Sequence, residues 1–234
     1  MNMHNYPLEA AEASLKERVI HATPIAEGLA ELALKTPVWN MTREMLNREF
    51  GDGRVAQVGI GLRAMVARDM ETNLFIKLYN QPVDALLQYL TMNTLHAHFE
   101  RVEAGIHAVR HLALLESDST ERERSVAIIE PAEADCAESL FYTPEQTRHI
   151  IKDVRTRSRN AIGWFKSRQL VNDFSPRHTG NIFIRPDGSY TMIDQPFYRG
   201  VMQAMVLGRL GAERTRELEG MMMVNPPLKS LPEF

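Results

Sequence analysis

Apolar side chains recur at helical spacing through the first fifty positions of the chain. Residues 8–20 keep a period of about 3.6 residues. Pro24 interrupts this pattern, because proline lacks a backbone N–H and its ring clashes with the preceding turn. A second helix is predicted over 25–34, and a third begins at Asn40 or Thr42, since either side chain could cap it. The pattern therefore predicts three helices before residue 51.

The pattern changes after the glycines at 51 and 53, which end the third helix. Residues 55–61, 65–67 and 74–79 are short runs rich in valine, isoleucine, leucine and methionine, and a turn-forming sequence over 69–73 separates two of them. Runs of this length and composition predict β-strands.

The second half of the chain mixes both kinds of element. Listed in order, we expect a long helix over 84–115, a buried strand over 125–130, a helix from Thr143 to about 165, a hairpin over 181–184 and 190–193, and one or two helices over 199–223. The turn at 186–188 (Pro-Asp-Gly) joins the two strands of the hairpin. This order of elements predicts an α+β fold.

Composition narrows the class of protein. The chain has 234 residues, of which 44% are hydrophobic and 24% charged, and its formal net charge is -3. These values exclude a disordered, collagen-like or disulfide-scaffold chain, and they do not favour nucleic acid or a membrane as a partner. The single cysteine, Cys136, cannot form an internal disulfide. Without an apparent signal peptide or a long apolar run, we expect a cytoplasmic protein with no membrane span.

The first candidate site surrounds two glycines. Gly59 and Gly61 would let the backbone of a hairpin approach phosphate groups closely. Val66, seven residues after the first glycine, would sit over a purine, and Lys77 on the next strand would pair with the phosphates as a point charge. The alternative is a plain hairpin with a lysine that faces solvent.

The second candidate site is at the predicted hairpin near the C-terminus. Asn181 precedes its first strand and Asp194 follows its second, so both side chains can converge on one edge of the hairpin. Two hard oxygen ligands there could hold Mg²⁺ that bridges nucleotide phosphates. The alternative is that Asn181 caps a turn and Asp194 is exposed at the end of a strand.

Together the two stretches resemble the protein-kinase-like superfamily, over about residues 53–200. The sequence His178-Thr-Gly-Asn-Ile-Phe, followed by Ile193-Asp194, is most similar to aminoglycoside-phosphotransferase-type kinases and to small bacterial or bacteriophage protein kinases. The resemblance implies a minimal two-lobed kinase-like fold, with a helical extension over 1–50 and a kinase-like domain over 51–234. Its N-lobe would cover about 51–130, and a reduced C-lobe about 131–234.

The resemblance also implies ATP and Mg²⁺ as cofactors. Gly59 and Gly61 would cover the phosphates, Lys77 would contact them, and Asn181 and Asp194 would hold the metal. The strand that ends at Glu130 would lead into the hinge beside the adenine, where 130–133 would supply backbone contacts.

The chain departs from the family at the catalytic base, because Pro176 stands where the family has an aspartate. Proline cannot accept a proton, and losing such a base costs about 10²–10⁴-fold in rate. Asp173 could serve if the loop carries a short insertion; otherwise it merely opens a turn. The acid that would pair with Lys77 is also open, with Glu100, Glu103 and uncharged Gln88 as the candidates.

Two functions follow from these observations. The first is a phosphotransferase acting on serine or threonine hydroxyls of proteins, with Asp173 as base and Asp194 at the metal. The second is a pseudokinase that binds a nucleotide or a partner without turnover. A small-molecule kinase fits less well, because such enzymes usually keep the aspartate.

A basic helix face completes the candidates. Arg148, Lys152, Arg155 and Arg159 line one side of the predicted helix after residue 143. They form either a solvated surface or a docking stripe for an acidic protein or a nucleic-acid backbone. No aromatic residues alternate with them to stack on bases, so nucleic acid is the less favoured partner.

Overall fold

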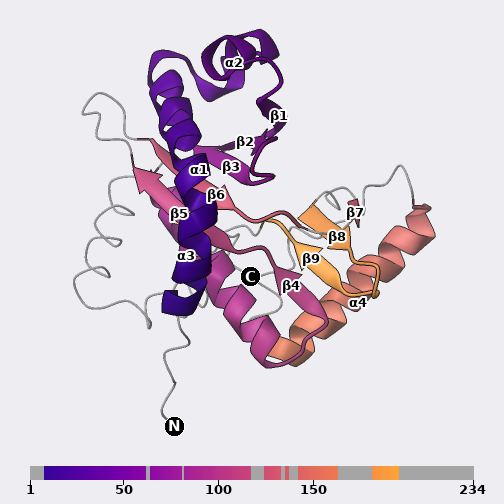
Figure 1. The fold of residues 1–234 in the computed structure, drawn as a ribbon. Helices are drawn as coiled ribbons and strands as arrows, with labels where there is room; N and C mark the ends of the chain where they lie inside the picture. Colours follow the sequence, from indigo (N-terminus) through magenta and orange to yellow (C-terminus); the bar gives the residue numbers. More distant parts are fainter. Residues whose placement is uncertain are drawn as a thin grey trace. The chain divides into compact units, whose positions relative to one another are not determined.

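The computed structural model describes residues 8–61, 64–80, 82–116, 124–132, 135–136, 142–162 and 181–194. These residues form a mixed α+β fold, as predicted (Figure 1). Its elements are α1 (Leu8–Lys35), the 3-10 helix η1 (Val38–Asn40), α2 (Arg43–Phe50), β1 (Val55–Ile60), β2 (Ala64–Asp69), β3 (Phe75–Tyr79), α3 (Pro82–Arg101), β4 (Ile106–Ala108), β5 (His111–Glu116), β6 (Ser125–Ile129), β7 (Asp135–Cys136), α4 (Pro144–Ile162), β8 (Ile182–Ile184) and β9 (Tyr190–Met192).

The chain divides into two compact units. The first consists of Met1–Tyr89 and His111–Pro131, and the second of Leu90–Arg110 and Ala132–Phe234. Helix α3 therefore begins in the first unit and ends in the second. Residues 1–50 belong to the same unit as the strands that follow them.

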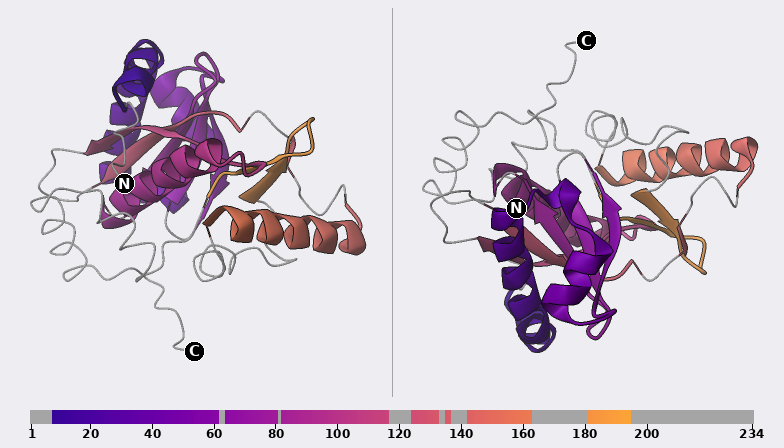
Figure 2. Two further views of the ribbon diagram at one scale, coloured as in Figure 1. Left: turned by 90° about the horizontal axis from the view of Figure 1, so that it is seen from below. Right: turned by 90° about the horizontal axis from the view of Figure 1, so that it is seen from above.

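The first unit is built on a five-stranded antiparallel sheet in the order β1-β2-β3-β6-β5. Helix α1 packs along one face of this sheet, against β6, β5 and β3, as both views of Figure 2 show. The core is the layer between them, where Leu29 and Ala33 of α1 meet Ile76, Leu78 and Ile128 of the sheet. Side chains alternate between the two faces of a strand, so β3 and β6 present every second residue to α1.

Helix α1 is continuous from Leu8 to Lys35, so the predicted break at Pro24 is wrong. Pro24 is exposed, whereas Ala22 and Ala26 beside it are fully buried against the sheet. Packing of this face stabilises the helix and offsets the backbone hydrogen bond that proline cannot donate.

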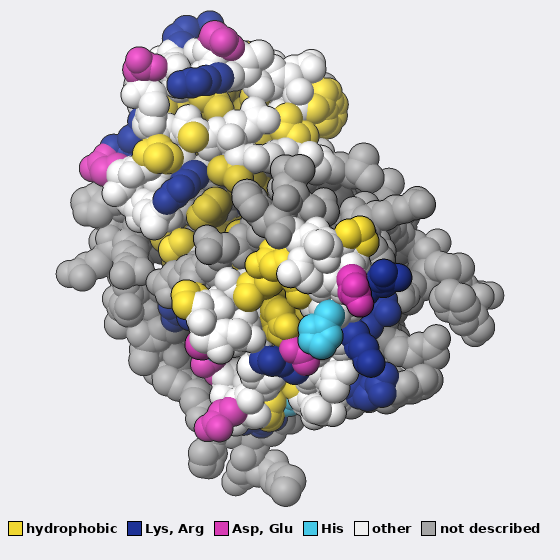
Figure 3. Space-filling model, turned by 90° about the vertical axis from the view of Figure 1, so that its right-hand side faces the viewer, with side chains coloured by type: hydrophobic (Ala, Val, Ile, Leu, Met, Phe, Trp, Pro, Cys, Tyr) yellow, Lys and Arg dark blue, Asp and Glu magenta, His cyan; other side chains and the backbone are white. Residues whose placement is uncertain are grey.

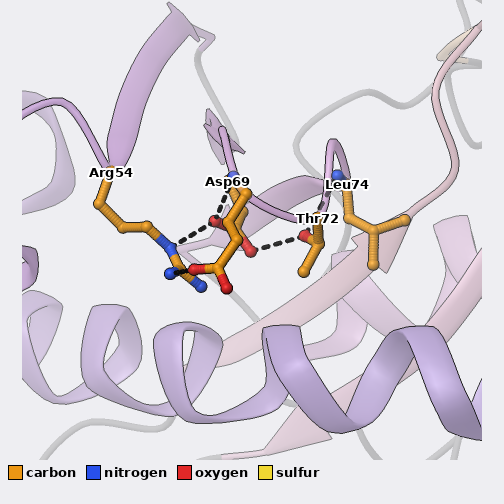
Figure 4. Close-up of polar contacts among 5 residues, drawn as sticks. Arg54, Asp69, Thr72 and Leu74 are labelled. Carbon is orange, nitrogen blue, oxygen red and sulfur yellow. Dashed lines mark hydrogen bonds and ion pairs between the residues drawn. The ribbon is translucent and has the colours of Figure 1, made fainter.

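The turn between β2 and β3 is held by the buried carboxylate of Asp69 (Figure 4). Asp69 accepts hydrogen bonds from Arg54 Nε at 2.8 Å and from Thr72 Oγ1 at 2.5 Å. The backbone N–H of Asp69 donates to the carbonyl of Leu74 at 2.9 Å. Arg54 also pairs with the exposed carboxylate of Glu71. These contacts set where β3 begins, and therefore where Lys77 lies.

The second unit contains a four-stranded sheet in the order β4-β9-β8-β7. β4 runs parallel to β9, and the β8–β9 hairpin is antiparallel, as predicted. Helix α4 packs against β4, and its buried positions are Thr147, Ile150, Ile151, Val154 and Ser158. Their spacing of three and four residues is that of a helix with one packed face.

The predicted long helix over 84–115 is wrong. Helix α3 ends at Arg101, and the chain then turns through Glu103 and Gly105, whose φ angles are 49° and 61°. Strands β4 and β5 follow. Apolar residues continue past Arg101 at spacings that a helix would also allow, and periodicity alone cannot separate a short buried strand from a helix.

The other predicted elements have mixed outcomes. Strands over 55–60, 64–69, 75–79 and 125–129 and the helix over 144–162 are confirmed. The helices predicted over 199–223 lie outside the described residues. None of the helices in the described part of the chain is both long and apolar enough to cross a bilayer.

Candidate functional site

A row of cross-strand partners brings three of the predicted site residues together in the first unit. Gly59 of β1 lies opposite Val66 of β2, and Val66 lies opposite Lys77 of β3. The row continues to Ala127 of β6. Residues directly opposite each other project from the same face of a sheet. Because Lys77 alternates with Ile76 and Leu78, this is the face that α1 does not cover.

This second face changes from open to closed along the row. Gly59 and Val66 are half-buried, whereas Lys77 is 7% exposed and Ala127 is fully buried. The Lys77 ammonium stands 5.2 Å from the ring centroid of Tyr79, which follows Lys77 by two residues on β3 and projects from the same face. A buried lysine at the inner end of an open strip places a positive charge where an anionic ligand can lie along the sheet.

Gly59 and Gly61 have different local surroundings. The N–H of Gly61 donates to the carbonyl of Ala64 at 2.8 Å, which closes the turn of the β1–β2 hairpin. No atom of the described residues lies within 4 Å of the place where a Cβ would stand at Gly59. As far as the described residues go, the space above Gly59 is open, and a side chain at this position would occupy it.

An aromatic residue that the sequence analysis did not single out borders this strip. Phe75 lies two residues before Lys77 on the same strand, so both project from the same face. Its ring carries the guanidinium of Arg68 at 5.7 Å, and Arg68 Nε also donates to Asn73 at 2.8 Å. The sequence could have indicated this position of Phe75, because side chains alternate along a strand and residues 75 and 77 therefore project from the same face.

Helix α3 contributes buried polar side chains to the first unit. Asp84 and Gln88 are one helical turn apart and are 4% and 5% exposed. Glu100 is exposed and contacts the ring of His107 at 2.5 Å, and Glu103 lies beyond the end of the helix. The prediction that placed Glu103 on this helix, as a partner for Lys77, is wrong because α3 ends at Arg101. Asp84 was not considered.

The predicted hinge residue, Glu130, directly follows β6 and is half-buried. The first unit ends one residue later, at Pro131. Residue 133, the far end of the predicted hinge, lies outside the described part of the chain.

In the second unit the β8–β9 hairpin brings Asn181 and Asp194 to one end. Ile182 pairs with Met192, and beyond this pair the N–H of Ile193 donates to the carbonyl of Asn181 at 3.1 Å. Asn181 and Asp194 therefore leave the open end of the hairpin side by side, and both side chains are half-buried.

The donor set at this end of the hairpin fits Mg²⁺. The amide oxygen of Asn181 and the carboxylate of Asp194 are hard oxygen ligands, and Mg²⁺ commonly takes one or two protein ligands together with phosphates and water. Across the described residues, no group of three or more histidine, cysteine, aspartate or glutamate side chains is placed to hold a metal ion. Two protein ligands at this place would leave the other coordination positions of Mg²⁺ to water or phosphate oxygens.

A buried network supports the other end of the same hairpin. The hydroxyl of Tyr190 donates to Asp153 Oδ2 of α4 at 2.9 Å, and Arg157 Nη2 contacts the same oxygen at 3.0 Å. Arg157 Nη1 donates to the carbonyl of Gly105 at 3.1 Å, and its guanidinium lies 4.9 Å from the centroid of the Tyr190 ring. Burial, with the hydrogen bond to Asp153, raises the pKa of Tyr190 to about 12. The network ties α4, the turn before β4 and β9 together.

The structure does not describe the predicted base, Asp173, or Pro176, which stands where the family has its catalytic aspartate. Asp173 and Pro176 both lie outside the described residues. The described residues therefore form two separate candidate sites: the row of Gly59, Val66 and Lys77 in the first unit, and the pair Asn181 and Asp194 in the second.

Comparison with known proteins adds no family assignment. No protein-family model matches the chain, and no curated protein matches it.

Proposed function

We propose that this chain is an ATP- and Mg²⁺-dependent phosphotransferase of minimal two-lobed, kinase-like fold that acts on serine or threonine hydroxyls of proteins in the cytoplasm. The observation that carries the proposal is the row Gly59, Val66 and Lys77 on the face of an antiparallel sheet that α1 does not cover. Kinases cover the nucleotide phosphates with a glycine-bearing hairpin and contact them with a lysine on the third strand. This chain has a glycine, an apolar residue and a lysine in register across its first three strands.

Each residue of the row has a physical task in this proposal. The open space at Gly59 admits phosphate oxygens close to the backbone, Val66 offers an apolar surface to the base, and the Lys77 ammonium balances phosphate charge. Asn181 and Asp194 would hold Mg²⁺, which neutralises charge that develops on the transferred phosphoryl group. Positioning and charge neutralisation account for most of the rate in this type of reaction.

Two further observations support the proposal. The first unit ends at Pro131, which agrees with a lobe boundary in the predicted hinge after Glu130. Asp84 is the buried acid on the helix that follows the lysine strand, and kinases pair that lysine with an acid from the corresponding helix. We propose Asp84 in this role in place of Glu100 and Glu103.

A pseudokinase is the second candidate function, and Pro176 favours it. Because proline cannot take the proton of an attacking hydroxyl, turnover would depend on Asp173. Without that contribution the chain would bind a nucleotide or a partner and would transfer phosphate slowly or not at all.

The test is transfer of the terminal phosphate from labelled ATP in the presence of Mg²⁺, with the chain itself and a cell extract as acceptors. The variant is Asp194→Asn. The matched control is Asp187→Asn, which makes the same change at an exposed carboxylate in the turn of the same hairpin. We expect wild type and the control to transfer label, and Asp194→Asn to fall at least about tenfold, since it loses one of two metal ligands.

The outcomes separate the two functions. Loss of transfer in Asp194→Asn alone supports the phosphotransferase, and Asp173→Ala then tests the base. No transfer by wild type, combined with a rise of its melting temperature in Mg²⁺-ATP that Asp194→Asn lacks, establishes the pseudokinase. Equal transfer by wild type and Asp194→Asn overturns the proposed metal site.

A further inference from the structure

We infer that the exposed basic stripe of α4, formed by Arg148, Lys152, Arg155 and Arg159, is a docking surface for an acidic protein segment. This inference does not depend on phosphotransfer, because it rests only on α4 and its neighbours in the second unit.

The four side chains form a continuous line on the helix. Their spacing of four, three and four residues keeps them within one narrow flank of α4, and the stripe extends over about 16 Å at 1.5 Å per residue. All four are exposed, whereas the packed face carries Ile150 and Val154. Figure 3 shows lysine and arginine side chains gathered in a band on the side of the molecule that carries α4.

The structure separates the basic residues of α4 that serve the fold from those that face solvent. Arg157 is half-buried and is held by Asp153 and by the carbonyl of Gly105. Asp153 in turn receives the hydroxyl of Tyr190. The half-buried Asp153 is therefore engaged by Arg157 and Tyr190. The four residues of the stripe are exposed instead.

The length and setting of the stripe favour a short acidic peptide over a nucleic acid. Four charges over about 16 Å match acidic side chains on three turns of a helix, or on alternate residues of an extended segment. The chain as a whole is negative, with a formal net charge of -3, and would repel a long polyanion beyond the stripe. Between Pro144 and Ala161 the exposed side chains of α4 include no phenylalanine, tyrosine or tryptophan to stack on a base, and the His149 imidazole is the one exposed ring.

Binding of a fluorescein-labelled peptide with alternating glutamate and serine residues tests the inference, read by fluorescence polarisation. The variant is Lys152→Glu with Arg159→Glu. The matched control is Arg43→Glu with Arg48→Glu on α2, where both arginines are exposed and the change in net charge is the same. We expect the stripe variant to bind at least about tenfold more weakly than wild type, equivalent to about 1.4 kcal/mol. The control should stay within about twofold, since α2 is not part of the proposed surface and the change in net charge alone is screened by salt.

Two additions make the result decisive. Lys152→Gln with Arg159→Gln removes the charges without reversing them, and it replaces the first variant if circular dichroism shows that the first does not fold. A fluorescein-labelled single-stranded oligonucleotide of similar length is measured in parallel. The inference is overturned if wild type shows no saturable binding of the peptide, if the stripe variant and the α2 control lose affinity equally, or if the oligonucleotide binds more tightly than the peptide.

Discussion

Lys77 and Val66 are direct cross-strand partners on β3 and β2, on the sheet face that α1 leaves uncovered. One is a buried cation and the other a half-buried apolar side chain. Directly opposed residues have Cβ atoms about 5 Å apart. The register between β2 and β3 therefore places the Lys77 ammonium, which suits a phosphate, beside the Val66 side chain, which suits a nucleotide base.

This pairing predicts the effect of Lys77→Met, which removes the charge and keeps most of the side-chain length. We expect wild type to gain about 1.4 kcal/mol of unfolding free energy at an ATP concentration ten times its dissociation constant, and the variant to lose that gain. Thermal unfolding with and without Mg²⁺-ATP measures it. Lys152→Met, at an exposed lysine of α4, is the control. An unchanged ATP response in Lys77→Met would contradict the assignment of Lys77.

The Tyr190 network predicts a loss of stability at high pH. Burial and the hydrogen bond to Asp153 raise the pKa of Tyr190 to about 12, above its ordinary value of 10.0. Between these values the unfolded chain has lost the phenolic proton and the folded chain keeps it, so stability falls as pH rises. Urea unfolding of wild type from pH 9 to pH 11.5 should decline more steeply than that of Tyr190→Phe, whose side chain does not titrate. Parallel declines would show that the hydroxyl is not held by Asp153.

The backbone conformation and surroundings of Gly105 predict a large loss of stability when alanine adds a methyl group there. Its φ of 61° disfavours any L side chain, and a Cβ there would lie 2.6 Å from Arg157 Nη1. We expect Gly105→Ala to cost about 2–4 kcal/mol, because backbone strain of about 1–2 kcal/mol adds to disruption of the Arg157 contact. Gly53→Ala is the matched control, since its φ is 72° and no described atom lies within 4 Å of the added Cβ. Equal losses in urea unfolding would mean that the contact with Arg157 contributes nothing.

The Asp69 carboxylate predicts that the β2–β3 turn depends on one buried acid. Asp69→Ala leaves Arg54 and Thr72 without their acceptor, and we expect a loss of about 2–4 kcal/mol in urea unfolding. Glu71→Ala removes the other, 61% exposed acid beside Arg54 and should cost less than about 1 kcal/mol. If the two variants lost similar free energies of unfolding, burial of Asp69 would not explain the contribution of its ion pair to stability.

The continuous helix α1 predicts that Pro24 is destabilising where it stands. Pro24→Ala restores a backbone donor at an exposed position within the helix, and we expect a gain of about 1–3 kcal/mol in urea unfolding. Glu27→Ala, one turn later at an exposed site, should change stability by less than about 0.5 kcal/mol. A loss of stability in Pro24→Ala would indicate that the proline stabilises the helix where it stands.

Much of the candidate site follows from local sequence signals. The strands around Gly59, Val66 and Lys77 and the hairpin between Asn181 and Asp194 were predictable, because period-2 runs bounded by turn residues specify strands almost alone. The acid that we propose as the partner of Lys77 did not follow from the sequence. The sequence placed Glu103 on the helix, because the apolar residues beyond Arg101 fit a helix and a buried strand equally well.

Local sequence alone thus determined strands β1, β2, β3, β6, β8 and β9, the turn of the β8–β9 hairpin and the α+β class, but not strands β4 and β5. Tertiary packing decided the rest. It carried α1 through Pro24, because burial of Ala22 and Ala26 outweighs one missing hydrogen bond. It paired β3 with β6 across a long stretch of chain, which aligned Lys77 with Ala127. It also set Arg157 of α4 apart from the exposed basic residues, since only the fold brings the Tyr190 ring and the carbonyl of Gly105 within reach of Arg157.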